Sequence, residues 1–162
     1  MTTTAAMTAG MAAATRRALL VLVGLALVLS VSAAADASNA SLKTTLAKWS
    51  HTIALDARRV DLSARHRHPR RMTTRAQRFR LDALRARRAL AAQRPSTVKG
   101  GRARSLALAA FRAYTVVGQQ WALTGRARVQ HRKALAARHA SVAKRFARNG
   151  NRLLIAAWRL LR

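Results

Sequence analysis

The sequence predicts an all-α protein, an antiparallel up-down bundle of about four helices with a short C-terminal helix after a break at 149–151. Three observations predict this fold. Ala, Leu and Arg, which are strong helix formers, dominate the chain. Apolar residues recur at steps of three and four, which is the spacing of one helical face. Only two prolines interrupt the pattern, and no stretch alternates as a strand does.

The first two helices are predicted over about 40–66 and about 72–93. Pro69 should end the first helix near His66, and Pro95 should close the second. The first apolar face is formed by Leu42, Leu46, Trp49, Ile53, Ala57 and Val60. The second is formed by Met72, Ala76, Phe79, Ala83, Ala86 and Leu90, and is widened by Leu81 and Leu84.

The third and fourth helices are predicted over about 102–124 and about 127–148. The third is the most apolar and should be the most buried, with a loop at 95–101 before it and Gly125 as its C-terminal cap. The fourth carries a seam of Leu135, His139, Val142 and Phe146. The segment after the break either extends the fourth helix or folds back as a short fifth helix.

The first 37 residues have the three parts of a secretory signal peptide. Arg16 and Arg17 precede an apolar run at 18–31, and small residues follow it. The Ala35-Asp36-Ala37 site predicts cleavage before Ser38, which leaves one cationic helical domain at 38–162. The alternative is that the leader is kept and residues 18–35 anchor the protein in the membrane. An organelle transit peptide is a further alternative, but its amphipathic pattern does not fit the apolar run.

The stretch Thr15-Arg16-Arg17-Ala18-Leu19-Leu20 resembles the twin-arginine export signal, which has Ser or Thr, two arginines, any residue and two apolar residues. The resemblance covers these six residues alone. A Lys often follows in that pattern, and Val21 stands in its place. General secretion and twin-arginine export therefore both remain open, and the strongly apolar run favours general secretion.

Charge is the most unusual property of the chain. It carries 32 Lys and Arg against 4 acidic residues, a formal net charge of +28, and no Cys. The lack of Cys excludes disulfides, thiolate metal sites and a Cys nucleophile. Self-repulsion on this scale favours conditions in which anions gather around the protein. An anionic partner is therefore expected.

No pattern of residues indicates catalysis, a metal or a cofactor. Asp56 and Asp61 point about 140° apart on a helix, which suits ion pairs with nearby arginines better than paired acid–base chemistry. His66 and His68 lie among arginines that repel a divalent cation. We therefore expect a protein that is not an enzyme and has no small-molecule substrate.

The candidate anion-binding residues lie on the second predicted helix, because guanidinium groups bind phosphate and carboxylate through paired hydrogen bonds. They are Arg71, Arg75, Arg78, Arg80, Arg85, Arg87, Arg88 and Arg94. The expected partner is an anionic envelope polymer, an anionic lipid surface or extracellular nucleic acid. An acidic protein partner is an alternative. With the leader, this predicts a secreted or envelope-associated protein.

Two alternatives to this function remain open. In the first, the C-terminal segment lies on anionic lipid through Leu153, Leu154, Trp158 and Leu161, and the protein acts on membranes. Packing of the same residues into the core is the competing interpretation. In the second, the protein binds nucleic acid inside a cell or organelle, as ribosomal or nucleoid proteins do.

Overall fold

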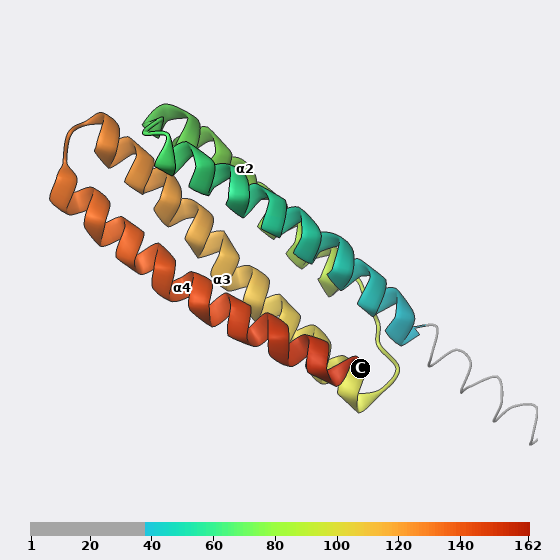
Figure 1. The fold of residues 1–162 in the computed structure, drawn as a ribbon. Coiled ribbons are helices and arrows are strands. Elements are labelled where there is room, and N and C mark those ends of the chain that lie inside the picture. Colours follow the sequence, from blue (N-terminus) through green and yellow to red (C-terminus); the bar gives the residue numbers. More distant parts are fainter. Residues whose placement is uncertain (1–37) are drawn as a thin grey trace, which may run out of the picture. The chain divides into compact units, whose positions relative to one another are not determined.

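The computed structural model describes residues 38–162, which pack as one unit. Its four helices cover residues 38–65, Pro69–Ala91 (α2), Val98–Val129 (α3) and Lys133–Leu160 (α4). They run side by side in alternating directions, as Figure 1 shows. The predicted all-α antiparallel bundle is thus confirmed. The predicted signal peptide, anchor and twin-arginine stretch lie outside the described residues.

The helix at 38–65 and α2 bury the faces that their apolar spacing predicts, with two exceptions. Pro69 opens α2 at its first turn, where its missing N–H costs nothing. Asp56, rather than Ala57, occupies the fully buried position, with 3% of its surface exposed. Leu81 does not widen the face of α2, because it is 54% exposed, while Asp82 beside it is only 6% exposed. Both exceptions place a carboxylate where the hydrophobic pattern favoured an apolar residue.

Helix α3 is longer than predicted at both ends. Thr97 caps its N-terminus, because the Thr97 hydroxyl accepts a hydrogen bond from the Gly100 amide at 3.0 Å. Residues 98–101, which the sequence predicted as part of a loop, therefore belong to the helix. Gly125 is not a C-terminal cap. It lies inside the helix, where a Cβ would come within 2.8 Å of the Pro69 carbonyl oxygen. Glycine there permits α3 to approach the start of α2 closely.

Helix α4 is continuous through 149–151, so the predicted break is wrong. Gly150 is buried, and a Cβ on it would lie 2.8 Å from the Tyr114 ring of α3. The neighbouring Asn151 accepts a hydrogen bond from the Tyr114 hydroxyl at 2.7 Å. Tertiary packing against Tyr114 therefore accounts for residues that read as a turn by composition. The buried positions of α4 are Ala136, Ala143, Gly150 and Ala157, spaced seven apart.

The core joins all four helices. Its largest fully buried side chains include Phe79, Phe111, Leu42, Leu46 and Leu90. The rings of Phe79 and Trp121 meet edge to face with centroids 5.2 Å apart. Within residues 38–162, no helix is long and apolar enough to cross a membrane.

Candidate functional site

The three described acidic residues are all engaged in ion pairs within their own helices. Asp56 pairs with Arg59 at 3.1 Å and Asp61 with Arg65 at 2.8 Å on the first helix. On α2, Asp82 lies 2.8 Å from Arg85 and 3.7 Å from Arg78. These are the local pairs that the sequence predicts for Asp56 and Asp61. They leave the other described basic residues without a carboxylate in the described part of the chain.

Asp56 and Asp82 also meet across the interface between the first helix and α2, which the sequence analysis missed. Burial raises the pKa of Asp56 above its ordinary value, and a hydrogen bond and negative charge from Asp82 raise it further, whereas Arg59 and Arg78 lower it. Oδ2 of Asp56 has no hydrogen-bond partner among the described residues. Protonation of Asp56 removes the negative charge that burial and Asp82 disfavour.

This carboxyl pair is enclosed by the bundle. Arg75 reaches across from α2 and donates to the Arg59 carbonyl and the Ser63 hydroxyl, each at 2.9 Å. Because Asp56 and Asp82 are almost fully buried, a substrate reaches them only if the two helices separate. The pair therefore acts as part of the helix interface. The seven-residue spacing of Ile53, Val60 and their neighbours around Asp56 is the signal that could have revealed it.

The eight arginines predicted to bind anions, seven on α2 and Arg94 just after it, fall into three groups. Arg75, Arg78 and Arg85 are held by the internal contacts described above. Arg87 is half-buried, and its Nε has no hydrogen-bond partner among the described residues. The remaining four are exposed and form no ion pair within the described residues: Arg71, Arg80, Arg88 and Arg94. Asp82 therefore neutralises part of the predicted row, although the Arg78 and Arg85 side chains that pair with it stay exposed.

A second basic surface, which the sequence analysis did not single out, lies on the outer face of α4. We call it the α4 basic row: Lys144, Arg145, Arg148 and Arg152, all exposed. With Ser141, Phe146 and Asn149 they line a shallow recess of about 800 Å³. Arg152 donates to the Asn149 side-chain oxygen at 3.0 Å, and the Arg145 guanidinium lies 5.7 Å from the Phe146 ring centre.

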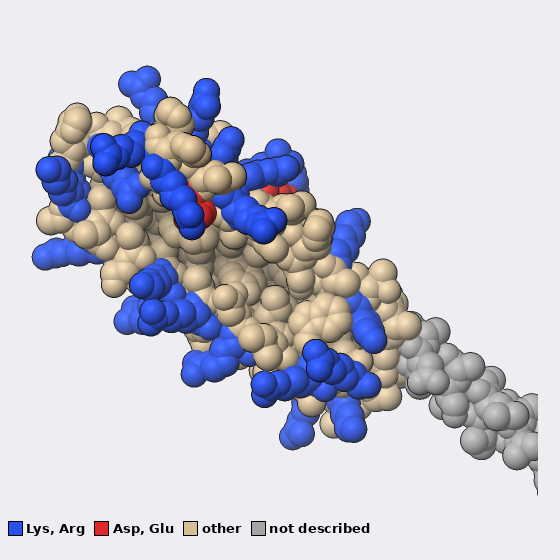
Figure 2. Space-filling model, in the orientation of Figure 1, with Lys and Arg blue, Asp and Glu red and all other residues tan. Residues whose placement is uncertain are grey.

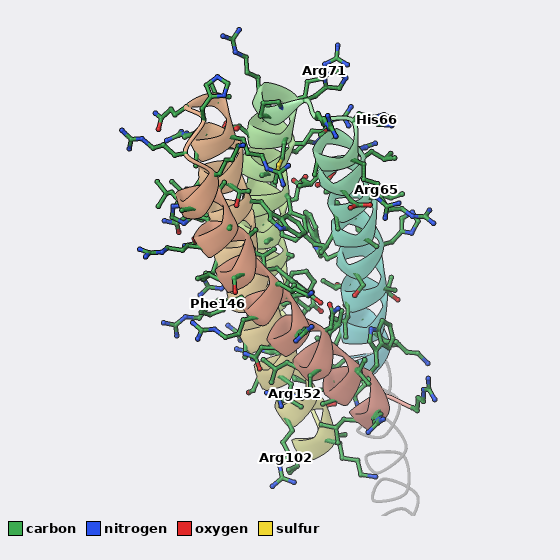
Figure 3. The ribbon with its side chains drawn as sticks, turned by 60° about the vertical axis from the view of Figure 1, so that its left-hand side comes forward. Arg65, His66, Arg71, Arg102, Phe146 and Arg152 are labelled. Atoms are coloured by element: carbon green, nitrogen blue, oxygen red, sulfur yellow. The ribbon has the colours of Figure 1, made fainter. Side chains whose placement is uncertain are left out.

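Within residues 38–162, no acidic residue forms an ion pair with the α4 basic row. Asp82 is the last acidic residue of the sequence, so α3 and α4 contain none. Figure 2 shows blue side chains along the α4 edge of the visible face, while the red acidic patches lie on the side of the first helix. Figure 3 labels Phe146 and Arg152, which come from this helix. The helical spacing of the basic residues in 144–152 could have indicated this row from the sequence. The lack of acidic residues in α3 and α4 is what sets it apart from the arginines of α2.

The two turns at one end of the bundle form a further cluster of charge. Arg67 and His131 both adopt the left-handed conformation, with φ of 55° and 56°. The recess beside them, of about 450 Å³, is lined by His68, Pro69, Arg70, Arg71, Arg128, Val129 and His131. Figure 3 shows His66 and Arg71 at this end and Arg102 at the other. Within residues 38–162, no group of His, Asp or Glu is arranged to hold a metal ion.

The C-terminal apolar residues pack inward. Leu153, Leu154, Trp158 and Leu161 are partly buried against the main core, whereas Ile155 is 54% exposed. This arrangement favours core packing over contact with lipid.

His139 lies between α3 and α4, where its Nδ1 is 2.7 Å from the Gln120 side-chain oxygen. It is thus an interior polar residue that bridges two helices.

Comparisons of this chain with protein-family models, with curated proteins and with solved structures give no match.

Proposed function

We propose that this protein is exported and binds anionic polymers or anionic surfaces outside the cytoplasm through multiple arginine contacts. The observation that supports the proposal is the α4 basic row, which is exposed and has no carboxylate on α3 or α4 to neutralise it. Wall polymers, lipid headgroups and extracellular nucleic acid share the repeated anions that such a row can contact. Export is proposed from the leader of the sequence alone.

The mechanism is multivalent contact between guanidinium groups and anions. Each arginine that neutralises a phosphate releases a condensed counterion, so affinity falls steeply as salt rises. Phe146 offers an apolar surface beside the row, but the row itself has no pattern that reads a particular sequence or headgroup. The protein should therefore select by charge density.

The first experiment measures binding of the protein to heparin, duplex DNA and vesicles of anionic phospholipid over a range of salt. We expect binding to all three at low salt, with affinity that falls as salt increases. Sulfate should raise the melting temperature more than chloride at equal ionic strength, because bound anions relieve self-repulsion. Indifference to all three probes at low salt would overturn the proposal.

The second experiment tests export. The N-terminus of the native protein should lie near Ser38 in an extracellular or envelope fraction, as the Ala35-Asp36-Ala37 site predicts. A native protein found inside the cell with residues 1–37 intact would support the intracellular nucleic-acid-binding alternative. Vesicle leakage that is lost on deletion of residues 152–162 would support the membrane-active alternative.

A further inference from the structure

An open groove separates the first helix from α4. It consists of two adjoining recesses of about 540 and 360 Å³ that share Ala54, Ala57, Arg58 and Trp121. Volumes of this order fall in the range of small-molecule sites, about 300–1,000 Å³. The middle of the visible face in Figure 2 is hollowed and uncharged, with blue side chains on either side. The groove is thus distinct from the α4 basic row.

The lining of the larger recess is mostly apolar and partly aromatic, with Ser50, His51 and Asn151 among its polar residues. Its floor is formed by Phe79 of α2 and by Tyr114, Val117 and Trp121 of α3. Ala147 and Leu154 of α4 form the wall opposite the first helix. The Tyr114 hydroxyl is already bonded to Asn151, and burial raises the pKa of Tyr114 to about 12, so it stays neutral. Of these four floor residues only Trp121 is partly exposed, while Phe79, Tyr114 and Val117 are buried, so the floor is apolar and uncharged.

Arg58 supplies the charge of the groove. It lines both recesses, is exposed, and forms no ion pair within the described residues. Asp61, the only described carboxylate that lines either recess, is paired with Arg65 at 2.8 Å. A single guanidinium at the junction of two apolar recesses matches one carboxylate joined to a long apolar chain.

We propose that the groove binds a long-chain fatty acid, with its acyl chain between the first helix and α4 and its carboxylate at Arg58. Charge complementarity favours this occupant over a second copy of the protein, because each copy carries a net charge of +28. The groove's lining comes from all four helices, so the residue pattern of any one helix does not indicate it. This site is independent of the proposed binding of polyanions.

Calorimetric titration with oleate, below the concentration at which it forms micelles, tests the proposal against oleyl alcohol, which has the same chain and no charge. We expect the protein to bind both and to bind oleate about two- to fivefold more tightly, the range for an exposed charge pair. Arg58→Gln should abolish that preference. Arg112→Gln, which removes an exposed charge from α3 outside the groove, should preserve it.

Two variants fill the groove. Ala147→Phe on α4 and Ala54→Phe on the exposed rim of the first helix should each weaken binding of both ligands at least about tenfold. Ala54 is exposed, so its variant tests the groove even if the Ala147 variant fails to fold. Circular dichroism verifies the fold of each.

Three results would overturn the proposal: equal affinity for oleate and oleyl alcohol, undiminished binding by the two filled variants, or an Arg112→Gln variant that loses the preference as Arg58→Gln does. A concentration-dependent dimer that the filled variants abolish would assign the groove to self-association instead. Because the acyl chain binds by apolar burial, oleate binding should persist at salt that abolishes heparin binding. Failure of one activity is thereby distinguished from failure of the other.

Discussion

The two halves of the bundle use arginine in opposite ways. In the half formed by the first helix and α2, three carboxylates hold arginines in ion pairs, and Arg75 bridges the two helices. In the half formed by α3 and α4 there is no acidic residue, and the α4 basic row faces solvent. The first half therefore pairs part of its positive charge internally, whereas the basic residues of the second half form no ion pair within residues 38–162.

This difference shows why a row of arginines is not by itself a binding surface. Arg78 and Arg85 on α2 and Arg145 and Arg152 on α4 are each seven residues apart and lie on one helical face. Their surroundings differ, because Asp82 lies between the first two, whereas no carboxylate of residues 38–162 pairs with the second two. Whether a carboxylate lies nearby, rather than the spacing of the arginines, therefore decides which row has unpaired positive charge.

The largest effect on stability is expected where α2 and α3, the adjoining helices of the two halves, pack together. A Cβ on Gly118 of α3 would lie 2.8 Å from the Arg80 backbone nitrogen of α2. Gly118→Val should therefore lower the free energy of unfolding by about 3 kcal/mol, the upper end of the usual cost of overpacking. Chemical denaturation measures this change.

Gly101 provides the matched control in the same helix. A Cβ there meets nothing within 4 Å, so Gly101→Ala should raise the free energy of unfolding by about 0.5–1 kcal/mol, the gain in helix propensity. If Gly118→Val were as stable as the wild type, the two halves would not be held by close backbone contact.

The second prediction compares the two arginine rows directly. R148Q/R152Q on α4 and R78Q/R85Q on α2 each remove two positive charges. A plot of log affinity for duplex DNA against log salt has a negative slope. The first variant should make that slope shallower by about 2, because each lost phosphate contact removes about 0.9 from its magnitude. The second should lower it by less than about 1. Fluorescence anisotropy with labelled DNA measures both, and equal slopes would contradict the division between the halves.

The smallest effect concerns the buried carboxyl pair. Because the pKa of Asp56 is raised in the fold, its contribution to stability is present at low pH and is lost as pH rises through that pKa. Asp56→Asn has no such loss. Its stability relative to the wild type should therefore increase with pH and reach a gain of about 1 kcal/mol near neutrality, the lower cost of an unsatisfied buried acceptor.

Asp61→Asn is the control for this prediction, because it removes the same charge from an exposed ion pair. Unfolding followed from acidic to neutral pH should show a much weaker dependence for that variant. A constant difference between Asp56→Asn and the wild type at every pH would show that the pKa of Asp56 is not raised in the fold.

The fold was predictable where the apolar spacing is strong. Met72, Phe79 and Ala86 repeat at seven residues, and all are buried as expected. The continuation of the helices through Gly125 and 149–151 was not predictable. In a sequence, a glycine that lets a neighbouring helix pack closely looks the same as a glycine that ends a helix. Only the approach of Pro69 or Tyr114 distinguishes the two cases.

The candidate site was less predictable than the fold. Asp82 appears in the sequence as a single interruption of the basic pattern, yet it holds two of the arginines predicted to bind anions. Asp56 lies one position from Ala57, and hydrophobicity alone favours burial of the alanine. Spacing within the first helix places Asp56 on the buried face, but only contacts between helices show that Asp82 is its neighbour.

The seven-residue spacing of Ala136, Ala143, Gly150 and Ala157 also constrains how the chain can change in length. Seven residues complete close to two turns, about 10 Å of helix, so an insertion of seven into every helix would lengthen the rod and preserve each face. Insertion of a single residue before Ala143 would instead rotate everything upstream by about 100° relative to the remainder. The positions of the arginines relative to the buried seven-residue repeat, as much as their number, therefore keep them exposed on α4.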